Sequence, residues 1–184
     1  NRTGATVISN YEIQSWLVNQ GVENTHPQHI GGGFDYPWGR VKLTIAHHGS
    51  ALPDGSYGGN PCGFLLYIED KKIYHACDTG LFYDMKLIGD EGIDLAILPI
   101  GAYLPRWFMS AQHIDPAEAV EAHRILGAPQ SMAIHFGTFR LADDGQEQPA
   151  RELLAALDAA AIPPSEFWIP DNGDSRQWPP HARR

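Results

Sequence analysis

The sequence predicts an α/β domain, and three observations support that prediction. Short apolar runs of the kind that form buried strands recur along the 184-residue chain, and amphipathic helix patterns separate them. The hydrophobic content of 43% is ordinary for a chain of this length with a real core. No internal repeat and no linker-like stretch divides the sequence, so we expect residues 1–184 to form a single domain.

The first third of the chain is predicted to hold two strands and one helix. Ala5–Ile8 is short, apolar and β-branched, which predicts a buried strand. Asn10 can then cap a helix over Tyr11–Gln20. Residues 22–39 are rich in His, Gly and Pro and are expected to form a turn-rich connection. Val41–Ala46 begins with alternating apolar and polar residues and should be the next strand.

The middle of the chain is predicted to form a hairpin, a short helix and a buried strand. Gly63–Ile68 and Lys72–Ala76 are the strands of the hairpin, which follows a Gly- and Pro-rich loop over residues 50–61. A short helix is expected near Tyr83–Ile88. Leu95–Ile100 is a continuous apolar run, which predicts another buried strand.

The last third is predicted to hold two helices and two strands. Asp115 marks a strong helix start, because this capping residue is followed by a proline and then by the glutamate of a capping box. Ser131–Ile134 predicts a strand, Arg151–Ala161 a Leu- and Ala-rich helix, and Phe167–Ile169 a last short strand. The tail Gln177–Arg184 is expected to be irregular.

Charge and composition argue against several classes of protein. The formal net charge is −9, from 22 acidic and 13 basic side chains, whereas nucleic-acid binding depends on clustered Lys and Arg. No apolar run is long enough to span a membrane, and no signal-peptide pattern opens the sequence. We therefore expect a cytoplasmic protein with no nucleic-acid partner and no transmembrane segment. A bound divalent metal could still supply a local positive centre.

Three candidate metal ligands stand at equivalent places in the sequence. His48, Asp78 and His135 each follow a predicted strand, where a side chain is held rigidly and still faces a cleft. Imidazole together with carboxylate suits Zn²⁺, and also Mn²⁺ or Fe²⁺. From the residues alone a second interpretation stays open, because a single His at a strand end is often a turn residue. Asp78 before Thr79 could likewise form an ordinary Asx turn.

Long stretches of the sequence resemble a known superfamily. Residues 73–82, which contain Cys77-Asp78-Thr79-Gly80, together with residues 84–89 and 94–101, resemble the UPF0173 group of metal-dependent hydrolases in the metallo-β-lactamase superfamily. Residues 101–109, 112–116 and 131–139 resemble the N-acyl-phosphatidylethanolamine phospholipase D branch of that superfamily. Together the two resemblances cover most of residues 5–177, which makes them more specific than any short motif.

The resemblance implies the metallo-β-lactamase fold, an αββα sandwich, of which this chain would be the C-terminal portion. The family signature His-x-His-x-Asp-His supplies the remaining metal ligands and has no counterpart here, because His26, His29 and the pair His47-His48 have the wrong spacing. In relatives the signature lies shortly upstream of the strand that here starts at Ala5. We therefore expect a domain that is incomplete at its N-terminus, with a site completed by a missing segment or a second chain.

The resemblance also assigns roles to individual residues. His48, Asp78 and His135 fall on metal ligands of the family, and Asp78 falls on the aspartate that bridges two metal ions. The implied cofactor is a pair of divalent ions, zinc first, with manganese or iron as alternatives. His113 matches an active-site histidine that lies beside the metals, and we expect it to act in catalysis together with Asp78.

The activity implied is hydrolysis by a metal-bound hydroxide. The expected substrate is a small or lipid-like molecule, either a phosphodiester, as in the phospholipase D-like relatives, or a lactone. A β-lactam or generic ester hydrolase of the same fold is one alternative, and a catalytically incomplete fragment or subunit is another. We also expect an oligomer, because apolar sheet faces left uncovered would associate.

Two further features leave alternatives open. Cys77 stands where relatives usually have Gly, and we interpret it as a tolerated small residue, with a metal-binding thiolate as the alternative. Together with Cys62 it is expected to be reduced, because two cysteines make no disulfide framework. Trp107, Phe108 and Met109 could wall a site for an acyl group, although buried core is the default for such residues.

Overall fold

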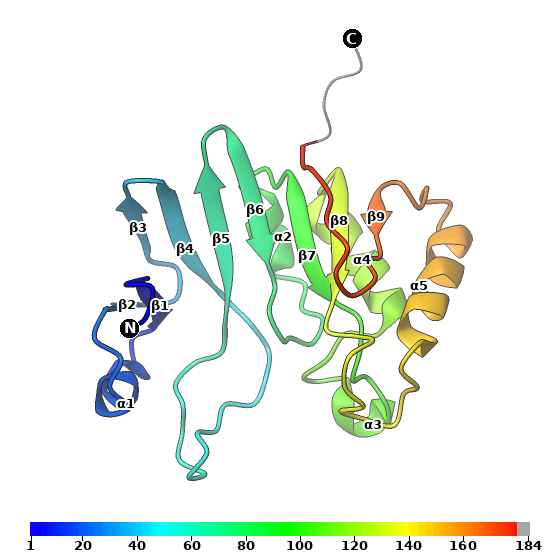
Figure 1. Cartoon of the computed structure of the whole chain (residues 1–184). Helices are drawn as coiled ribbons and strands as arrows, with labels where there is room; N and C mark the ends of the chain where they lie inside the picture. The colour runs from blue at the N-terminus through cyan, green and yellow to red at the C-terminus, as the bar shows by residue number, and fades with distance from the viewer. Residues whose placement is uncertain (180–184) are drawn as a thin grey trace.

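The computed structural model describes residues 1–179, and its main element is a seven-stranded sheet (Figure 1). The strands follow one another across this sheet in chain order: β3 (Gly33–Tyr36), β4 (Gly39–Ile45), β5 (Cys62–Ile68), β6 (Lys71–His75), β7 (Leu95–Pro99), β8 (Gln130–Ile134) and β9 (Phe167–Trp168). Residues 180–184 of the tail that we expected to be irregular lie outside the described part of the chain.

The direction of the strands changes halfway across the sheet. Neighbouring strands from β3 to β6 pair antiparallel, whereas those from β6 to β9 pair in parallel. The parallel connections contain α2 (Met85–Gly89), then α3 (Arg106–Met109) with α4 (Pro116–Leu126), then α5 (Gln148–Ala159). Because β4 and β6 are both antiparallel to β5, the carboxyl ends of β4, β6, β7 and β8 lie at the same edge of the sheet.

One face of the sheet carries the main hydrophobic core of the described residues. Figure 1 shows α2 and α4 behind this face, with α5 beside them toward β9. Leu65, Tyr74 and Ala96 pair across β5, β6 and β7 and therefore point to the same side, where all three are fully buried. Leu126 of α4 and Leu153 of α5 pack in the same cluster. This packing fixes the sheet, and with it the edge at which the strands end.

The opposite face of the sheet is apolar but only half-buried. Phe64 of β5, Ile97 of β7, Met132 of β8 and Trp168 of β9 share one row of the pairing register on this side. Each of the four is partly exposed. A row of apolar side chains in contact with water favours association, which is the basis of the expectation that the protein is an oligomer.

A separate two-stranded sheet precedes the main one. β1 (Val7–Asn10) pairs in parallel with β2 (Thr25–Gln28), and α1 (Gln14–Asn19) connects them. The strand predicted at Ala5–Ile8 is thus present, but the prediction that it is buried is wrong, because Val7 is 38% exposed. Asn10 accepts the N–H of Ile13 at 3.0 Å and caps the turn before α1, so the helix begins later than predicted.

The predicted turn-rich connection over residues 22–39 is wrong, because both β2 and β3 lie within it. Aromatic contacts stabilise these strands in place of an apolar run. The ring of His26 packs edge-on against Phe34 with the centroids 4.2 Å apart, and the hydroxyl of Tyr36 lies 2.8 Å from Nδ1 of His26. Single His and Tyr side chains in a Gly- and Pro-rich stretch carry no periodic signal that could have predicted these strands.

The helix start at Asp115 is confirmed in detail. Its Oδ1 accepts the N–H of Glu118 at 2.8 Å, and Oε2 of Glu118 accepts the N–H of Asp115 at 3.0 Å, which makes a complete capping box. The remaining predicted strands and helices lie within about three residues of the observed ones. None of the helices formed by residues 1–179 is long and apolar enough to cross a membrane.

The short helix α3 was not predicted. It exposes most of the Trp107 side chain, at 85%, and more than half of Phe108, at 56%. The default assumption that these residues belong to the core is therefore wrong. Trp107 and Phe108 pack against each other at the surface, with ring centroids 5.7 Å apart.

Candidate metal centre

The topology of the sheet brings the three predicted metal ligands to one place. His48 follows β4, Asp78 follows β6 and His135 follows β8 directly. Because the carboxyl ends of these three strands share one edge of the sheet, side chains distant in sequence meet there. His113, which lies between α3 and α4, reaches the same edge from the connection that follows β7.

The four side chains form a chain of contacts, here called the His–Asp cluster: His48, Asp78, His113 and His135. Nε2 of His135 lies 3.4 Å from Oδ2 of Asp78, and Nε2 of His48 lies 3.3 Å from Nε2 of His113. The rings of His113 and His135 stack with centroids 5.4 Å apart and join the two pairs. The structure thus brings together all four residues that the sequence singled out.

A hydrogen bond fixes the protonation of His48. Its Nδ1 lies 2.7 Å from the carbonyl oxygen of Gly49, which can only accept, so Nδ1 carries the proton and donates it. In the neutral ring the unprotonated Nε2 then faces His113, and a hydrogen bond between the two Nε2 atoms requires the proton to be on that of His113. His48 therefore presents a bare imidazole nitrogen to the cluster, the form that a metal ligand requires.

Burial and charge set the ionisation of the cluster. The hydrogen bond with His135, helped by the charges of the surrounding histidines, holds the pKa of Asp78 below its usual value. The same bond raises the pKa of His135. Burial, together with the neighbouring imidazoles of His48 and His135, lowers the pKa of His113 to about 4. At neutral pH the cluster therefore contains an ionised Asp78 and a neutral His113.

The donor chemistry of the cluster fits a divalent metal, although the number of donors is small. Nδ1 of His113 and Nδ1 of His135 are buried and have no hydrogen-bond partner within residues 1–179. Buried polar atoms of this kind are normally satisfied by a ligand or by water. Yet no three His, Cys, Asp or Glu side chains in that part of the chain are placed to hold a single ion. The cluster offers donors in pairs, which is below the three protein ligands typical of catalytic zinc.

The backbone around the cluster adopts conformations that non-glycine residues avoid. Cys77, Ala102 and His135 have φ angles of 56°, 59° and 62°, and each stands at or just beyond the end of a strand. Such residues cost about 1 kcal/mol or more each and gather at functional sites. The left-handed conformation of Cys77 also gives a physical reason why glycine suits this position.

The thiol of Cys77 is directed at a neighbour outside the cluster. Its Sγ lies 3.3 Å from Nδ1 of His75, and burial raises its pKa to about 12. A thiol in this environment stays protonated at neutral pH and is a poor metal donor in that form. The geometry therefore favours the interpretation of Cys77 as a tolerated small residue.

Several residues that support the cluster carried no recognisable signal in the sequence. Arg106 of α3 donates to the carbonyl oxygen of His113 at 2.8 Å and to Oε2 of Glu118 at 2.7 Å, and so ties His113 to the start of α4. Gln112 accepts the N–H of Gly49 through its side chain at 3.1 Å. These contacts depend on how α3 and the loops pack, which no local pattern encodes.

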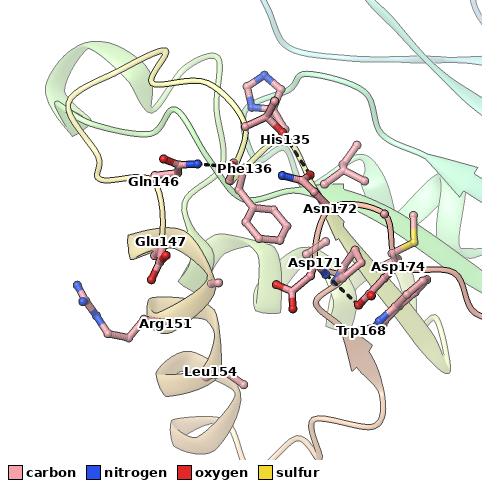
Figure 2. Close-up of a pocket in the computed structure, with 18 residues that line it drawn as sticks. His135, Phe136, Gln146, Glu147, Arg151, Leu154, Trp168, Asp171, Asn172 and Asp174 are labelled. Atoms are coloured by element: carbon pink, nitrogen blue, oxygen red, sulfur yellow. Dashed lines mark hydrogen bonds between the residues drawn. The ribbon is translucent and has the colours of Figure 1, made fainter.

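A cavity of about 760 Å³ adjoins the cluster at His135, between β8, α5 and the segment after β9 (Figure 2). In Figure 2 the Phe136 ring points into it from the loop after β8, whereas Arg151 extends outward from α5. Leu154 and Trp168 contribute apolar surface to its lining. Three carboxylates also line the cavity, against the single cation Arg151: Glu147, Asp171 and Asp174. No sequence pattern predicts this lining, because it joins a loop, one face of α5 and the turn after β9.

Known proteins resemble this chain along most of its length. A sequence model described as a beta-lactamase superfamily domain matches residues 2–136. A UPF0173 metal-dependent hydrolase of Desulforamulus reducens is 40% identical over 172 residues, which are 90% of this chain and 72% of that protein. One from Thermus thermophilus is 35% identical over 167 residues, 90% of this chain and 70% of that protein.

Solved structures resemble the fold as well. A metallo hydrolase from the archaeon Ignicoccus hospitalis superimposes with a TM-score of 0.71 at 27% identity, covering 94% of this chain and 68% of that one. The relatives named here are thus longer than this chain, which spans between 68% and 72% of their lengths.

Proposed function

Since the chain belongs to the metallo-β-lactamase superfamily, within its UPF0173 group of metal-dependent hydrolases, we propose that the His–Asp cluster is its share of a two-metal site. In this proposal His48, Asp78 and His135 hold the metal ions and His113 acts on the substrate. We further propose that the substrate is a neutral lactone or related ester. The observation that carries the metal site is the convergence of the four side chains at one edge of the sheet.

The residues that would hold metal are those with a free donor atom facing the cluster. Asp78 contributes a carboxylate that is ionised at neutral pH, and His48 contributes the Nε2 of its neutral ring. His135 contributes its Nε2, which would first give up the proton that it now shares with Asp78. Divalent ions of this kind activate water and polarise the oxygen of a carbonyl or phosphoryl group. Zinc suits the donor set best, with manganese or iron as alternatives. These are three ligands for two metal ions, so further ligands would have to come from another segment or chain.

His113 would donate a hydrogen bond to the substrate through its N–H. Its Nε2 carries the proton that now points to His48, and its low pKa keeps the ring neutral near pH 7. A neutral imidazole with its N–H aimed into the site can orient a substrate oxygen and stabilise the negative charge that develops on it as the bond breaks. The bond from Arg106 to its carbonyl oxygen holds the His113 backbone in place while it does so.

The cavity beside His135 supports a neutral substrate. Glu147, Asp171 and Asp174 outnumber Arg151 among its lining residues, and the whole chain carries a net charge of −9. A lining of this sign repels phosphodiesters and carboxylates and tolerates neutral or cationic groups. Phe136, Leu154 and Trp168 provide apolar surface for the hydrocarbon part of a lactone or ester.

A phosphodiester is the second candidate, because residues 101–109, 112–116 and 131–139 resemble the phospholipase D branch. A substrate panel on protein whose site has been completed with the family's signature segment separates the candidates: a neutral aliphatic lactone, bis(p-nitrophenyl) phosphate and a β-lactam, each assayed with added zinc or manganese. We expect the lactone to be turned over fastest. Faster hydrolysis of the phosphodiester would reject the lactone and support the phosphodiester, and preference for the β-lactam would reject both.

A catalytically incomplete subunit is the remaining alternative, and the shortage of donors in residues 1–179 is the observation that favours it. Elemental analysis of the purified chain after incubation with zinc and desalting tests it directly. Bound metal without turnover on any substrate would support a subunit that needs a partner. No bound metal, before or after adding a segment with the family signature, would reject the metal site itself.

A further inference from the structure

We propose that Thr79 is a positioning residue that sets the spacing between His48, Asp78 and His113. This inference rests on the proposed metal site, because it concerns how that site is held together. Thr79 directly follows Asp78 and is fully buried, with a relative exposure of 0%. Its side chain and backbone both bond to segments far away in the sequence.

The hydroxyl of Thr79 ties the loop of Asp78 to the loop of His48. Its Oγ1 accepts the backbone N–H of His47 at 2.9 Å and donates to the carbonyl oxygen of Gly80 at 2.8 Å. The N–H of Gly80 in turn donates to the carbonyl oxygen of His47 at 2.8 Å. Two hydrogen bonds therefore clamp His47 against Thr79 and Gly80, and His48 is the next residue along that clamped strand end.

The backbone of Thr79 ties the same loop to the segment that carries His113. The carbonyl oxygen of Thr79 accepts the N–H of Ile114 at 3.0 Å, and Ile114 is itself fully buried in the core. Gly80 fits closely against this segment, because a Cβ there would lie 2.6 Å from the carbonyl oxygen of Ala111. His113 thus stands next to a residue whose position is set by Thr79 and by the core together.

A second tie runs directly between the two other loops. Oε1 of Gln112 accepts the N–H of Gly49, and a Cβ on Gly49 would lie 2.8 Å from that oxygen. Gln112 adjoins His113 and Gly49 adjoins His48. The three loops therefore form a closed ring of hydrogen bonds, in which the Thr79 hydroxyl is the one buried side-chain member. Groups that orient ligands in this way commonly change metal affinity by about 10- to 100-fold when they are removed.

Valine in place of Thr79 tests the hydroxyl with little change in shape. Thr79→Val removes the acceptor for His47 and the donor to Gly80, whereas Thr79→Ser keeps both. Ser131→Ala is the matched control, because Ser131 is 2% exposed and its hydroxyl lies 2.8 Å from Nδ1 of His123. Ser131 stands near the start of β8, whereas the cluster lies beyond the end of that strand. Thr79→Val and Ser131→Ala each remove a buried, hydrogen-bonded hydroxyl, and only the hydroxyl of Thr79 lies beside the cluster.

Two measurements on the full chain decide the matter. The first is the affinity for Co²⁺, followed by its visible absorption. We expect Thr79→Val to weaken it about tenfold, Thr79→Ser to restore it and Ser131→Ala to leave it unchanged. The second is the set of imidazole ¹⁵N resonances in the metal-free protein. We expect Thr79→Val to shift the signals of His48 and His113, and Ser131→Ala to leave both in place while it lowers the melting temperature.

The second measurement separates this inference from the proposed function. If the wild-type chain binds no cobalt, the metal site fails, and the metal-free resonances still test Thr79. Unchanged resonances of His48 and His113 in Thr79→Val, or equal effects of Thr79→Val and Ser131→Ala, would overturn the positioning role. Should Thr79→Val not fold, Gln112→Met cuts the neighbouring tie at a half-buried site. The same two resonances should then move, and their failure to do so would reject the ring as the device that spaces the cluster.

Discussion

Nε2 of His135 lies 3.4 Å from Oδ2 of Asp78, although the strands that carry them, β8 and β6, are separated in the sheet by β7. Two strand spacings amount to about 10 Å, so the side chains converge in front of the end of β7. The left-handed backbone of His135, at φ 62°, and that of Cys77 before Asp78, at φ 56°, turn the chain at these strand ends. The contact between His135 and Asp78 is therefore accompanied by strained backbone at His135 and at Cys77.

Replacing Asp78 by Asn should weaken metal binding at least about tenfold. The amide keeps the shape of the side chain but removes the negative charge that His135 now stabilises. Isothermal titration with zinc measures the effect. Asp90→Asn is the control, because Asp90 directly follows α2 and is an exposed partner of Lys86. Equal zinc affinity in Asp78→Asn and the wild type would remove Asp78 from the ligand set.

Replacing His113 by Ala should depress turnover far more than metal content. Removing one preorganised hydrogen-bond donor costs about 10²- to 10³-fold in turnover, and the N–H of His113 is the donor that we propose to stabilise the charge on the reacting oxygen. The measurement pairs kcat on the best substrate of the panel with elemental analysis of the same sample, using protein whose site has been completed with the family's signature segment. Parallel loss of metal and turnover would make His113 a ligand, and no loss of either would return it to a structural role.

The sequence predicted the strands that carry the cluster because their signals are local. β4, β5, β6, β7 and β8 are apolar runs or alternating runs bounded by Gly, Pro or charged residues, and each has a recognisable period. Predicting the fold family, and with it the candidate residues His48, Asp78, His113 and His135, required long matching stretches. The neighbours in space of a single His or Asp at a strand end are unknown until the order and direction of the strands are known.

The parts that could not be predicted depend on contacts between distant segments. β2 and β3 are stabilised by the packing of His26 against Phe34 and Tyr36, and these single aromatic side chains follow neither the strand nor the helix period. The ring of bonds through Thr79, and the carboxylates that line the cavity from Glu147 to Asp174, likewise appear only once loops pack together. Side chains of this kind are polar, and polar residues in loops are ordinary in any sequence.

Neutralising the carboxylates of the cavity should change which substrates are accepted. Glu147→Gln combined with Asp171→Asn reduces three negative lining charges to one, which matches the positive charge of Arg151. We expect the ratio of kcat/KM for bis(p-nitrophenyl) phosphate to that for a neutral lactone to rise several-fold, since repulsion of the anion is relieved. Glu121→Gln, on the exposed side of α4, serves as the control for a change in overall charge. An unchanged ratio would mean that substrates do not enter this cavity.

His123 should make the fold sensitive to mild acid. Burial lowers its pKa from the ordinary value of 6.5, with Arg124 acting in the same direction and Glu166, 3.9 Å from its Nε2, acting against it. Below pH 6.5 the unfolded chain therefore binds a proton that the folded chain does not. The stability that neutral His123 contributes is complete above pH 6.5 and is lost as the pH falls toward its folded pKa.

Urea denaturation at several pH values between 7 and 5 checks the contribution of His123. The free energy of unfolding should fall with pH more steeply in the wild type than in His123→Gln, which has no proton to bind at this position. Ser131→Ala removes the hydroxyl that bonds Nδ1 but keeps the imidazole, so its slope should stay close to that of the wild type. Identical slopes in wild type and His123→Gln would show that His123 is not held neutral in the folded state.

The 184-residue chain by itself should bind zinc weakly and hydrolyse little. Catalytic zinc sites normally use three protein ligands for each ion, whereas within residues 1–179 the proposed ligands number three for two ions: His48, Asp78 and His135. Zinc retained after dialysis against a chelator should therefore be well below two ions per chain. Supplying a segment with the His-x-His-x-Asp-His signature, fused or as a second chain, should raise both metal content and turnover. A fused segment with the histidines and the aspartate of the signature changed to alanine is the control, because it covers the same apolar surface without adding donors. Two tightly held ions and full turnover on the chain alone would show that the ligands have been assigned to the wrong residues.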